Sequence, residues 1–163
     1  MTKILFTDID GTLLDDKKQI PTKNQQAIDD LIAKGHKIVL TTGRALSGTV
    51  GQAEKLGLTF DGCYIIAFNG AEIYDSFRRE TLYKCSIPLD TVARIFAICD
   101  EQKVHVQTYD DKYVLAREDN SYLRRYCKEI VCESKIDIDL PGSLKEEPSK
   151  LLLLSYDAPD KLN

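Results

Sequence analysis

The pattern of apolar and polar positions changes period several times along the first part of the chain. Residues 3–8 contain a short apolar run, Ile4-Leu5-Phe6, that predicts a strand. Residues 22–34 carry apolar side chains every three or four positions, as on one helix face. A buried strand over residues 36–42, a second helix ending at Gly57 and a third strand over residues 63–68 follow. Repeated strand–helix units predict a parallel sheet with helices on its faces.

Local signals predict the boundaries and inward faces of these two helices. Residues 22–25 match a capping box after Pro21, and Gly35 is placed to end the first helix. Each helix is therefore expected to be amphipathic, with one side against the sheet. The residues expected to face inward are Ile28, Leu31 and Ile32 in the first helix, and Leu46, Val50, Ala53 and Leu56 in the second.

The regular alternation of predicted strands and helices ends after residue 70. Residues 71–74 and 80–83 have the alternation of two strands joined in a hairpin. Two further short strands are predicted near residues 104–109 and 112–116. A polar stretch without a clear element then leads to an apolar run over residues 151–156.

A third helix is predicted from Pro88, because proline is favoured at a helix start and apolar residues follow at helical spacing. Its expected inward residues are Leu89, Val92, Ala93, Phe96 and Cys99. We therefore expect residues 1–83 to form an α/β core around a Rossmann-like parallel sheet. Residues 84–163 are expected to form a second, α+β unit.

The last residues carry the signals of a helix start. Residues 157–160 read as an N-cap, an early-helix proline and an acid in the first turn. The sequence stops at Asn163 before such a helix could form. Either this tail is a fraying end, or the chain is the front portion of a longer protein.

The composition of the chain limits the classes of partner that it can bind. The chain has 163 residues, of which 43% are hydrophobic and 29% charged, as in a globular protein of one domain or one domain with part of another. Its net charge of −4 offers no broad basic surface, so nucleic acid and anionic membranes are poor candidates as the main partners. The basic pairs at residues 17–18, 78–79 and 124–125 are short and scattered, as on solvated faces or turns.

The cysteines point to a reducing compartment. Five cysteines form an odd set without C-x-x-C spacing, mostly inside apolar runs, which favours reduced, packed thiols. With only two histidines, no histidine–cysteine metal cluster is predicted. The N-terminus has no signal-peptide core, and no apolar stretch approaches membrane-spanning length. We expect a soluble, cytoplasmic protein.

Two acids stand at the end of the first strand. Asp8 and Asp10 leave the same face, because side chains alternate along a strand, and Gly11 then lets the backbone turn. Two close carboxylates repel, so they need a nearby cation or one pKa must rise. An acidic turn is the simplest alternative. A calcium loop fails, because Leu13 and Gln19 replace its required glycine and glutamate.

The second strand ends in Thr41-Thr42-Gly43-Arg44, shortly before a helix. A hydroxyl, a glycine backbone and a helix N-terminus can hold a phosphate, and Arg44 can add charge. The same residues could serve only as a helix cap. The parallel sheet favours the phosphate-binding interpretation, because it brings the ends of the first and second strands side by side.

With both elements present, the chain resembles the haloacid dehalogenase superfamily, and most of all its Cof-type sugar phosphatases. Residues 8–14 match the first motif of that family and residues 42–44 its second, while residues 69–71 match its Asn-Gly turn. The resemblance covers residues 1–83 and, more loosely, the start of a cap inserted after the third strand. It therefore implies an N-terminal core portion followed by a partial α/β cap.

The resemblance implies roles for the two acids. Asp8 would attack phosphorus and form an aspartyl-phosphate. Asp10 would protonate the leaving oxygen and then deprotonate water, helped by a pKa raised by its acidic neighbour. Mg²⁺ would be held by the Asp8 carboxylate and the Asp10 main-chain carbonyl. Asp10 also favours a phosphatase or phosphomutase over a transport ATPase.

The resemblance also implies a substrate-binding set. Thr42 and the Gly43 N–H would hold the transferring phosphoryl group, and Arg44 and Asn69 would touch the substrate. The family's phosphate-bracing lysine and its Gly-Asp motif lie after the cap, and this sequence has no Gly-Asp pair. Lys150 opens an apolar strand, so a structural role is the better reading for it.

The function expected from all this is Mg²⁺-dependent hydrolysis of phosphate monoesters of small metabolites, with sugar phosphates foremost. Weak metal binding and impaired turnover are expected of these residues alone. The alternative is a non-catalytic phosphate-binding or interaction fragment, motivated by uncovered strand edges and apolar faces. A phosphomutase is the third reading. The sequence names neither the substrate nor the oligomeric state.

Overall fold

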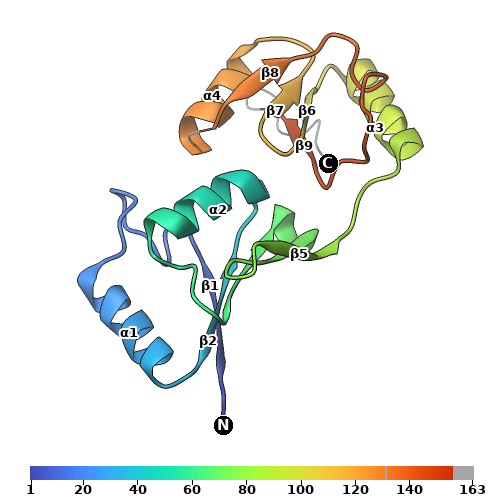
Figure 1. The fold of residues 1–163 in the computed structure, drawn as a ribbon. Helices are drawn as coiled ribbons and strands as arrows, with labels where there is room; N and C mark the ends of the chain where they lie inside the picture. Colours follow the sequence, from blue (N-terminus) through green and yellow to red (C-terminus); the bar gives the residue numbers. More distant parts are fainter. Residues whose placement is uncertain (131, 156–163) are drawn as a thin grey trace. The chain divides into compact units, whose positions relative to one another are not determined.

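The computed structural model describes residues 1–130 and 132–155, and the chain forms two units, Met1–Lys84 and Cys85–Asn163 (Figure 1). The division falls one residue from the boundary expected from the sequence. The α/β class is confirmed. The helix start predicted at residues 157–160 lies outside the described residues.

The first unit is built on one five-stranded sheet in the order β1-β2-β3-β4-β5. Strands β1 to β3 run parallel, as predicted, and the hairpin β4–β5 extends the sheet with antiparallel pairing, so the sheet is mixed. The strand bounds are β1 Ile4–Asp8, β2 Lys37–Thr41, β3 Cys63–Ala67, β4 Glu72–Asp75 and β5 Glu80–Lys84.

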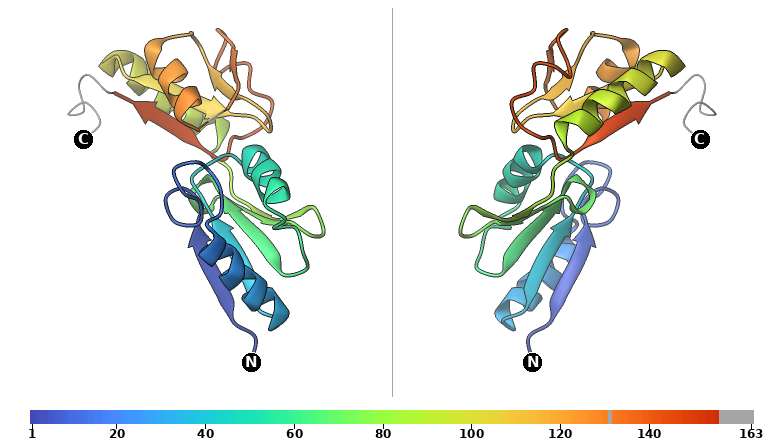
Figure 2. Two further views of the ribbon diagram at one scale, coloured as in Figure 1. Left: turned by 90° about the vertical axis from the view of Figure 1, so that its left-hand side faces the viewer. Right: turned by 90° about the vertical axis from the view of Figure 1, so that its right-hand side faces the viewer.

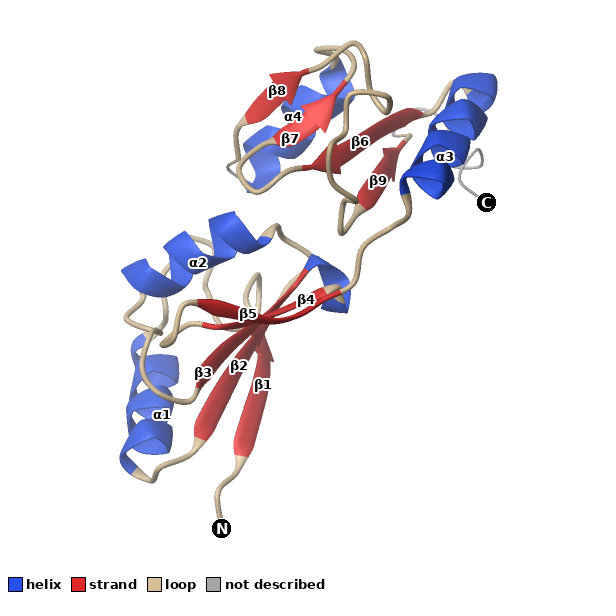
Figure 3. Ribbon diagram, turned by 45° about the vertical axis from the view of Figure 1, so that its right-hand side comes forward, coloured by secondary structure: helices blue, strands red, loops and turns tan. Residues whose placement is uncertain are grey.

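Helices α1 (Thr22–Ala33) and α2 (Leu46–Lys55) connect the parallel strands and lie on the same side of the sheet (Figure 3). This arrangement follows from two right-handed crossovers in the same direction. Gly35 ends α1 in the left-handed conformation, as predicted, with φ of 67°. The predicted capping box is wrong, because Pro21 occupies the N-cap and no side chain caps this helix end.

The inward faces of these helices were predicted only in part. Ile28 and Ala53 are buried as expected, but Ile32 is exposed. In α2 the fully buried residue beside Ala53 is Thr49, while Val50 is half-buried. Thr49 can be buried because its hydroxyl donates a 2.9 Å hydrogen bond to the Ala45 carbonyl.

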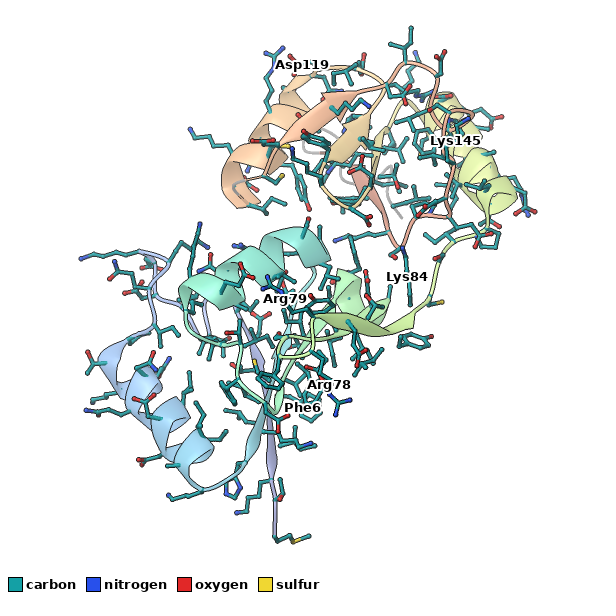
Figure 4. All side chains as sticks on the ribbon, viewed as in Figure 1. Phe6, Arg78, Arg79, Lys84, Asp119 and Lys145 are labelled. Atoms are coloured by element: carbon teal, nitrogen blue, oxygen red, sulfur yellow. The ribbon has the colours of Figure 1, made fainter. Side chains whose placement is uncertain are left out.

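Strand β1 is an edge strand, since its only strand partner within the described part of the chain is β2. Ile4, Leu5 and Phe6 are all exposed, and Phe6 leaves 59% of its surface open (Figure 4). On the neighbouring β2, Ile38 and Leu40 are fully buried. The apolar side chains of β1 therefore form an uncovered edge of this sheet.

In its described residues, the second unit contains a four-stranded sheet in the order β8-β7-β6-β9 and two helices (Figure 2). Its core joins Val92, Phe96 and Cys99 of α3 to Val106 and Leu115 of the sheet. The prediction for α3 was wrong at Leu89 and Ala93, which are exposed. The bounds are α3 Leu89–Gln102, β6 His105–Tyr109, β7 Val114–Ala116, α4 Ser121–Ile130, β8 Ser134–Ile136 and β9 Leu151–Leu154.

A row of polar side chains on β6 is buried in the second unit. His105 Nε2 lies 3.2 Å from Gln107 Oε1, Gln107 Nε2 lies 3.4 Å from the Tyr109 hydroxyl, and that hydroxyl donates to Tyr126 at 2.7 Å. Alternate residues share one face of a strand, so the row follows from the strand period. Helix α4 and strand β8 were not predicted. No helix within residues 1–130 and 132–155 is both long and apolar enough to cross a membrane.

Candidate active site

The first site element is the loop that follows β1. The N–H of Leu13 donates to the Asp8 carbonyl at 3.2 Å, and the N–H of Leu14 donates to the Ile9 carbonyl at 3.0 Å. Gly11 turns the chain with φ of 73°, a conformation that glycine adopts without steric cost. Because Ile9, Leu13 and Leu14 are buried, the loop is anchored on both sides of Asp10.

Backbone hydrogen bonds join the ends of β2 and β3 to each other. The N–H of Thr42 donates to Ile66 at 2.9 Å, the N–H of Asn69 donates to the Thr42 carbonyl at 3.1 Å, and the N–H of Phe68 donates to Arg44 at 3.0 Å. Strand β1 pairs beside them, with Asp8 opposite Thr41. The carboxyl ends of three parallel strands therefore meet, where ligands bind in such sheets.

A hollow of about 340 Å³ lies at these strand ends. Four of the six residues predicted for the site line it: Asp8, Thr42, Gly43 and Asn69. Thr42 is buried and its hydroxyl accepts the N–H of Arg44 at 3.1 Å, which leaves the O–H hydrogen to donate toward the hollow. The structure thus brings the acid of the first motif to the hydroxyl of the second.

Asp10 and Arg44, the other two predicted residues, bind each other. Arg44 Nε donates to Asp10 Oδ2 at 2.8 Å and Arg44 Nη2 donates to Asp10 Oδ1 at 2.7 Å. Such two-pronged pairs are the strong form of the arginine–carboxylate contact. The resemblance implied that Arg44 touches substrate, whereas here it contacts the acid at the end of the neighbouring strand.

Lys18 is a site residue that the sequence did not reveal. Its Nζ lies 2.7 Å from Asp10 Oδ1, the same oxygen that Arg44 Nη2 contacts. The sequence placed Lys18 in a basic pair on a solvated face or turn, and the residue is indeed exposed, but its contact with Asp10 was not predicted. The only available signal was Asp15, an acid typical of tight turns, which shapes the loop that carries Lys18.

The charge state of Asp10 follows from these contacts. Partial burial raises the pKa of its carboxyl, but hydrogen bonds and attraction from Lys18 and Arg44 outweigh burial, so the pKa lies below its ordinary value. The sequence had predicted a raised pKa caused by the neighbouring acid, and this prediction was wrong. Asp10 is therefore held as a carboxylate between two cations.

The Asp8 carboxylate has a different environment. Asp8 is exposed and lines the hollow. Among the residues that the structure describes, none forms a hydrogen bond or ion pair with the Asp8 side chain. A carboxylate without such partners can serve as a nucleophile or a metal ligand. The two acids thus differ in what surrounds them, although they stand two residues apart.

The donors present fit part of a Mg²⁺ shell. The described residues contain no group of three or more histidine, cysteine, aspartate or glutamate side chains placed to hold a metal ion. The Asp8 carboxylate lies open to the hollow, and the other predicted donor is the backbone carbonyl of Asp10. Because Mg²⁺ commonly takes one or two carboxylates together with water and substrate phosphate, these two donors fit it, though weakly.

This chain is similar in sequence to a known protein family and to several bacterial proteins. A family model described as haloacid dehalogenase-like hydrolase matches residues 5–162. YxeH of Bacillus subtilis is 32% identical over 110 residues, which cover 68% of this chain and 41% of YxeH. YitU of the same organism, named a 5-amino-6-(5-phospho-D-ribitylamino)uracil phosphatase, is 32% identical over 117 residues, which cover 68% of this chain and 41% of YitU. This chain thus matches about two fifths of each relative.

A solved structure supports the fold. A haloacid dehalogenase-like hydrolase from Bacteroides thetaiotaomicron matches with a TM-score of 0.85 at 24% sequence identity. The match covers 99% of this chain and 60% of that protein. The likeness therefore extends over both units of the chain.

Proposed function

The chain belongs to the family of haloacid dehalogenase-like hydrolases, and we propose that it carries the nucleophile and phosphate-binding part of a phosphatase site. The proposed reaction is hydrolysis of phosphate monoesters of small metabolites, with sugar phosphates as the expected class. The observation that carries the proposal is the hollow where Asp8 meets Thr42, Gly43 and Asn69.

In the proposed first step, a carboxylate oxygen of Asp8 attacks phosphorus while the bond from phosphorus to the leaving oxygen breaks. Thr42 donates its hydroxyl hydrogen to a phosphoryl oxygen, and the backbone of Gly43 and the amide of Asn69 contact the same ligand. The leaving oxygen takes a proton from Asp10, so the products are an alcohol and an aspartyl-phosphate at Asp8.

In the second step, Asp10 takes a proton from water, whose oxygen attacks phosphorus. The bond between phosphorus and the Asp8 oxygen breaks, which releases inorganic phosphate and restores the carboxylate. Asp10 can donate a proton only when it holds one, and its contacts with Arg44 and Lys18 favour the ionised form. We therefore infer that the arrival of substrate draws at least one of these cations away from Asp10.

Mg²⁺ is the proposed cofactor. The Asp8 carboxylate and the Asp10 main-chain carbonyl would hold it. When bound, it would offset the negative charge between the carboxylate and the phosphate. Because the described residues offer so few metal ligands, we expect the affinity for Mg²⁺ to be weak.

The test is phosphate release from a panel of sugar phosphates, with and without Mg²⁺, by the chain and by Asp8→Asn. We expect slow, Mg²⁺-dependent release that is lost in the variant. Equal release by both proteins would contradict the proposed role of Asp8.

A second candidate function is a phosphate-binding module without turnover. The observation that favours it is the absence of a three-group metal cluster from the described residues. Binding of sugar phosphate that depends on Thr42 and Asp8, with no covalent adduct and no release at any Mg²⁺ concentration, would favour this module over the enzyme.

A further inference from the structure

Lys18 stands in a loop whose shape is fixed by Asp15. The Asp15 carboxylate oxygen Oδ1 accepts the backbone N–H of Lys17 at 2.9 Å and that of Gln19 at 3.0 Å. The backbone of Asp15 also pairs with Gln19 and Lys18, each at 2.9 Å. Lys18 itself adopts φ of 59°, a left-handed conformation that is uncommon for residues other than glycine. These hydrogen bonds hold the loop in one conformation, which fixes the position of the Lys18 backbone.

This loop directs the Lys18 ammonium to the site. Its Nζ shares one carboxylate oxygen of Asp10 with Arg44, each at 2.7 Å. Two cations on one carboxylate leave one positive charge that can offset the Asp8 carboxylate in the hollow. Arg44 is linked onward through its backbone N–H to the Thr42 hydroxyl, at the edge of the hollow. A phosphate entering this hollow brings further negative charge, so a cation one side chain away is suited to bind it.

The mobility of the two cations differs. Arg44 is held by both prongs of its guanidinium, and its side chain is only 17% exposed. Lys18 makes a single contact through a flexible stem, and its side chain is 48% exposed. Because a lysine ammonium is a point charge that can exchange one anion for another, Lys18 is the cation that can move to an incoming ligand.

We propose that Lys18 is a phosphate-binding residue of this site, which turns from Asp10 to the phosphoryl group when a phosphorylated ligand enters. The inference rests on the proposed function and adds a specific residue to it. Lys18 would act by direct contact with the phosphoryl oxygens. Asp15 would act indirectly, as a positioning residue for Lys18.

The experiment is a titration of the 163-residue chain with orthovanadate and with inorganic phosphate at low ionic strength and fixed pH, followed by NMR. The variants are Lys18→Met, Lys18→Arg and the matched control Lys17→Met, since Lys17 belongs to the same turn. Methionine and arginine should adopt the left-handed backbone conformation of residue 18 at the same cost as lysine. Circular dichroism checks the fold of each variant.

We expect Lys18→Met to weaken binding of both anions about tenfold, as for loss of one charge-assisted hydrogen bond. Lys18→Arg should stay close to the unmodified chain, and Lys17→Met should not differ from it. Unchanged or tighter binding in Lys18→Met would overturn the inference while leaving the proposed function intact. Absence of any binding by the unmodified chain would overturn the proposed function and the inference together.

Discussion

Arg44 and Asp10 are joined by two hydrogen bonds of 2.8 and 2.7 Å, although 34 positions separate them in the sequence. Arg44 follows β2 and Asp10 follows β1, so the pair ties together the loops at the ends of two parallel strands. Through its backbone N–H, Arg44 also reaches the Thr42 hydroxyl. Arg44 therefore helps Lys18 to keep Asp10 ionised and also contacts the Thr42 hydroxyl.

Replacement of Arg44 should raise the pKa of Asp10. Arg44→Met removes both prongs and the charge, whereas Arg44→Lys keeps the charge without the fork, so the larger rise is expected for methionine. A carboxyl carbon NMR titration of Asp10 measures both shifts. Arg78→Met is the control, because Arg78 lies near Asp75 and Glu80. An unchanged Asp10 titration in Arg44→Met would contradict the assigned role of the pair.

Asp10→Asn should separate the two proposed chemical steps. Acetyl phosphate has a good leaving group that needs no proton, so phosphorylation of Asp8 by this donor should survive the change. Hydrolysis of the adduct should slow by about 10²-fold or more, because the base that activates water is lost. Mass spectrometry of the intact chain over time follows both steps. Rapid loss of the adduct in the variant would argue against Asp10 as the base.

The second unit should lose stability as the pH falls. Burial lowers the pKa of His105, a shift partly offset by its bond to Gln107. Asn120 accepts the N–H of Leu123 through Oδ1 and therefore presents Nδ2 to His105 Nδ1, which must be unprotonated to accept it. A folded-state pKa below the unfolded value means that stability is present above about pH 6.5 and is lost as the pH falls through the folded pKa.

The measurement is the urea midpoint of the chain as a function of pH. His105→Gln should flatten the decline below about pH 6.5, because the titrating group is gone. His36→Gln, at the other histidine, should leave the decline in place. If His105→Gln kept the full decline, another group would have to account for it.

The exposed edge of β1 predicts self-association. Phe6→Thr should cost little stability, because Phe6 is already 59% exposed, and it should reduce association at high concentration. Phe96→Ala, at a fully buried aromatic, should cost about 3–5 kcal/mol by comparison. Light scattering and chemical denaturation measure the two effects. A Phe6→Thr variant as destabilised as Phe96→Ala would mean that β1 is covered in solution.

Much of the fold could be predicted because its elements have strong local signals. The strand at residues 36–42 is centred on the apolar run Ile38-Val39-Leu40, and the β4–β5 hairpin has clear alternation around a turn. Helix α4 was missed because its segment is strongly polar as a whole, although Tyr122, Leu123 and Tyr126 recur at helical spacing on one face. Its start is marked by Asn120, which accepts the N–H of Leu123 as an N-cap residue does.

The placement of the candidate residues at one edge of the sheet could be predicted, but the contacts among them could not. Parallel strands must end at the same edge of the sheet, so the hollow at Asp8 and Thr42 followed from topology. The lowered pKa of Asp10 depends on where Lys18 and Arg44 side chains reach, which sequence spacing does not encode. Thr49 was missed for a similar reason, since a buried hydroxyl satisfied by a backbone carbonyl has no apolar signal.

The central claim is that Asp8 is the nucleophile, and reductive trapping tests it most directly. The chain is incubated with acetyl phosphate and Mg²⁺, treated with borohydride and digested, and the peptide that contains residue 8 is analysed by mass spectrometry. The account predicts conversion of Asp8 to homoserine, which depends on acetyl phosphate and leaves Asp10 unmodified. Conversion at another aspartate, or none at any acetyl phosphate concentration, would contradict it.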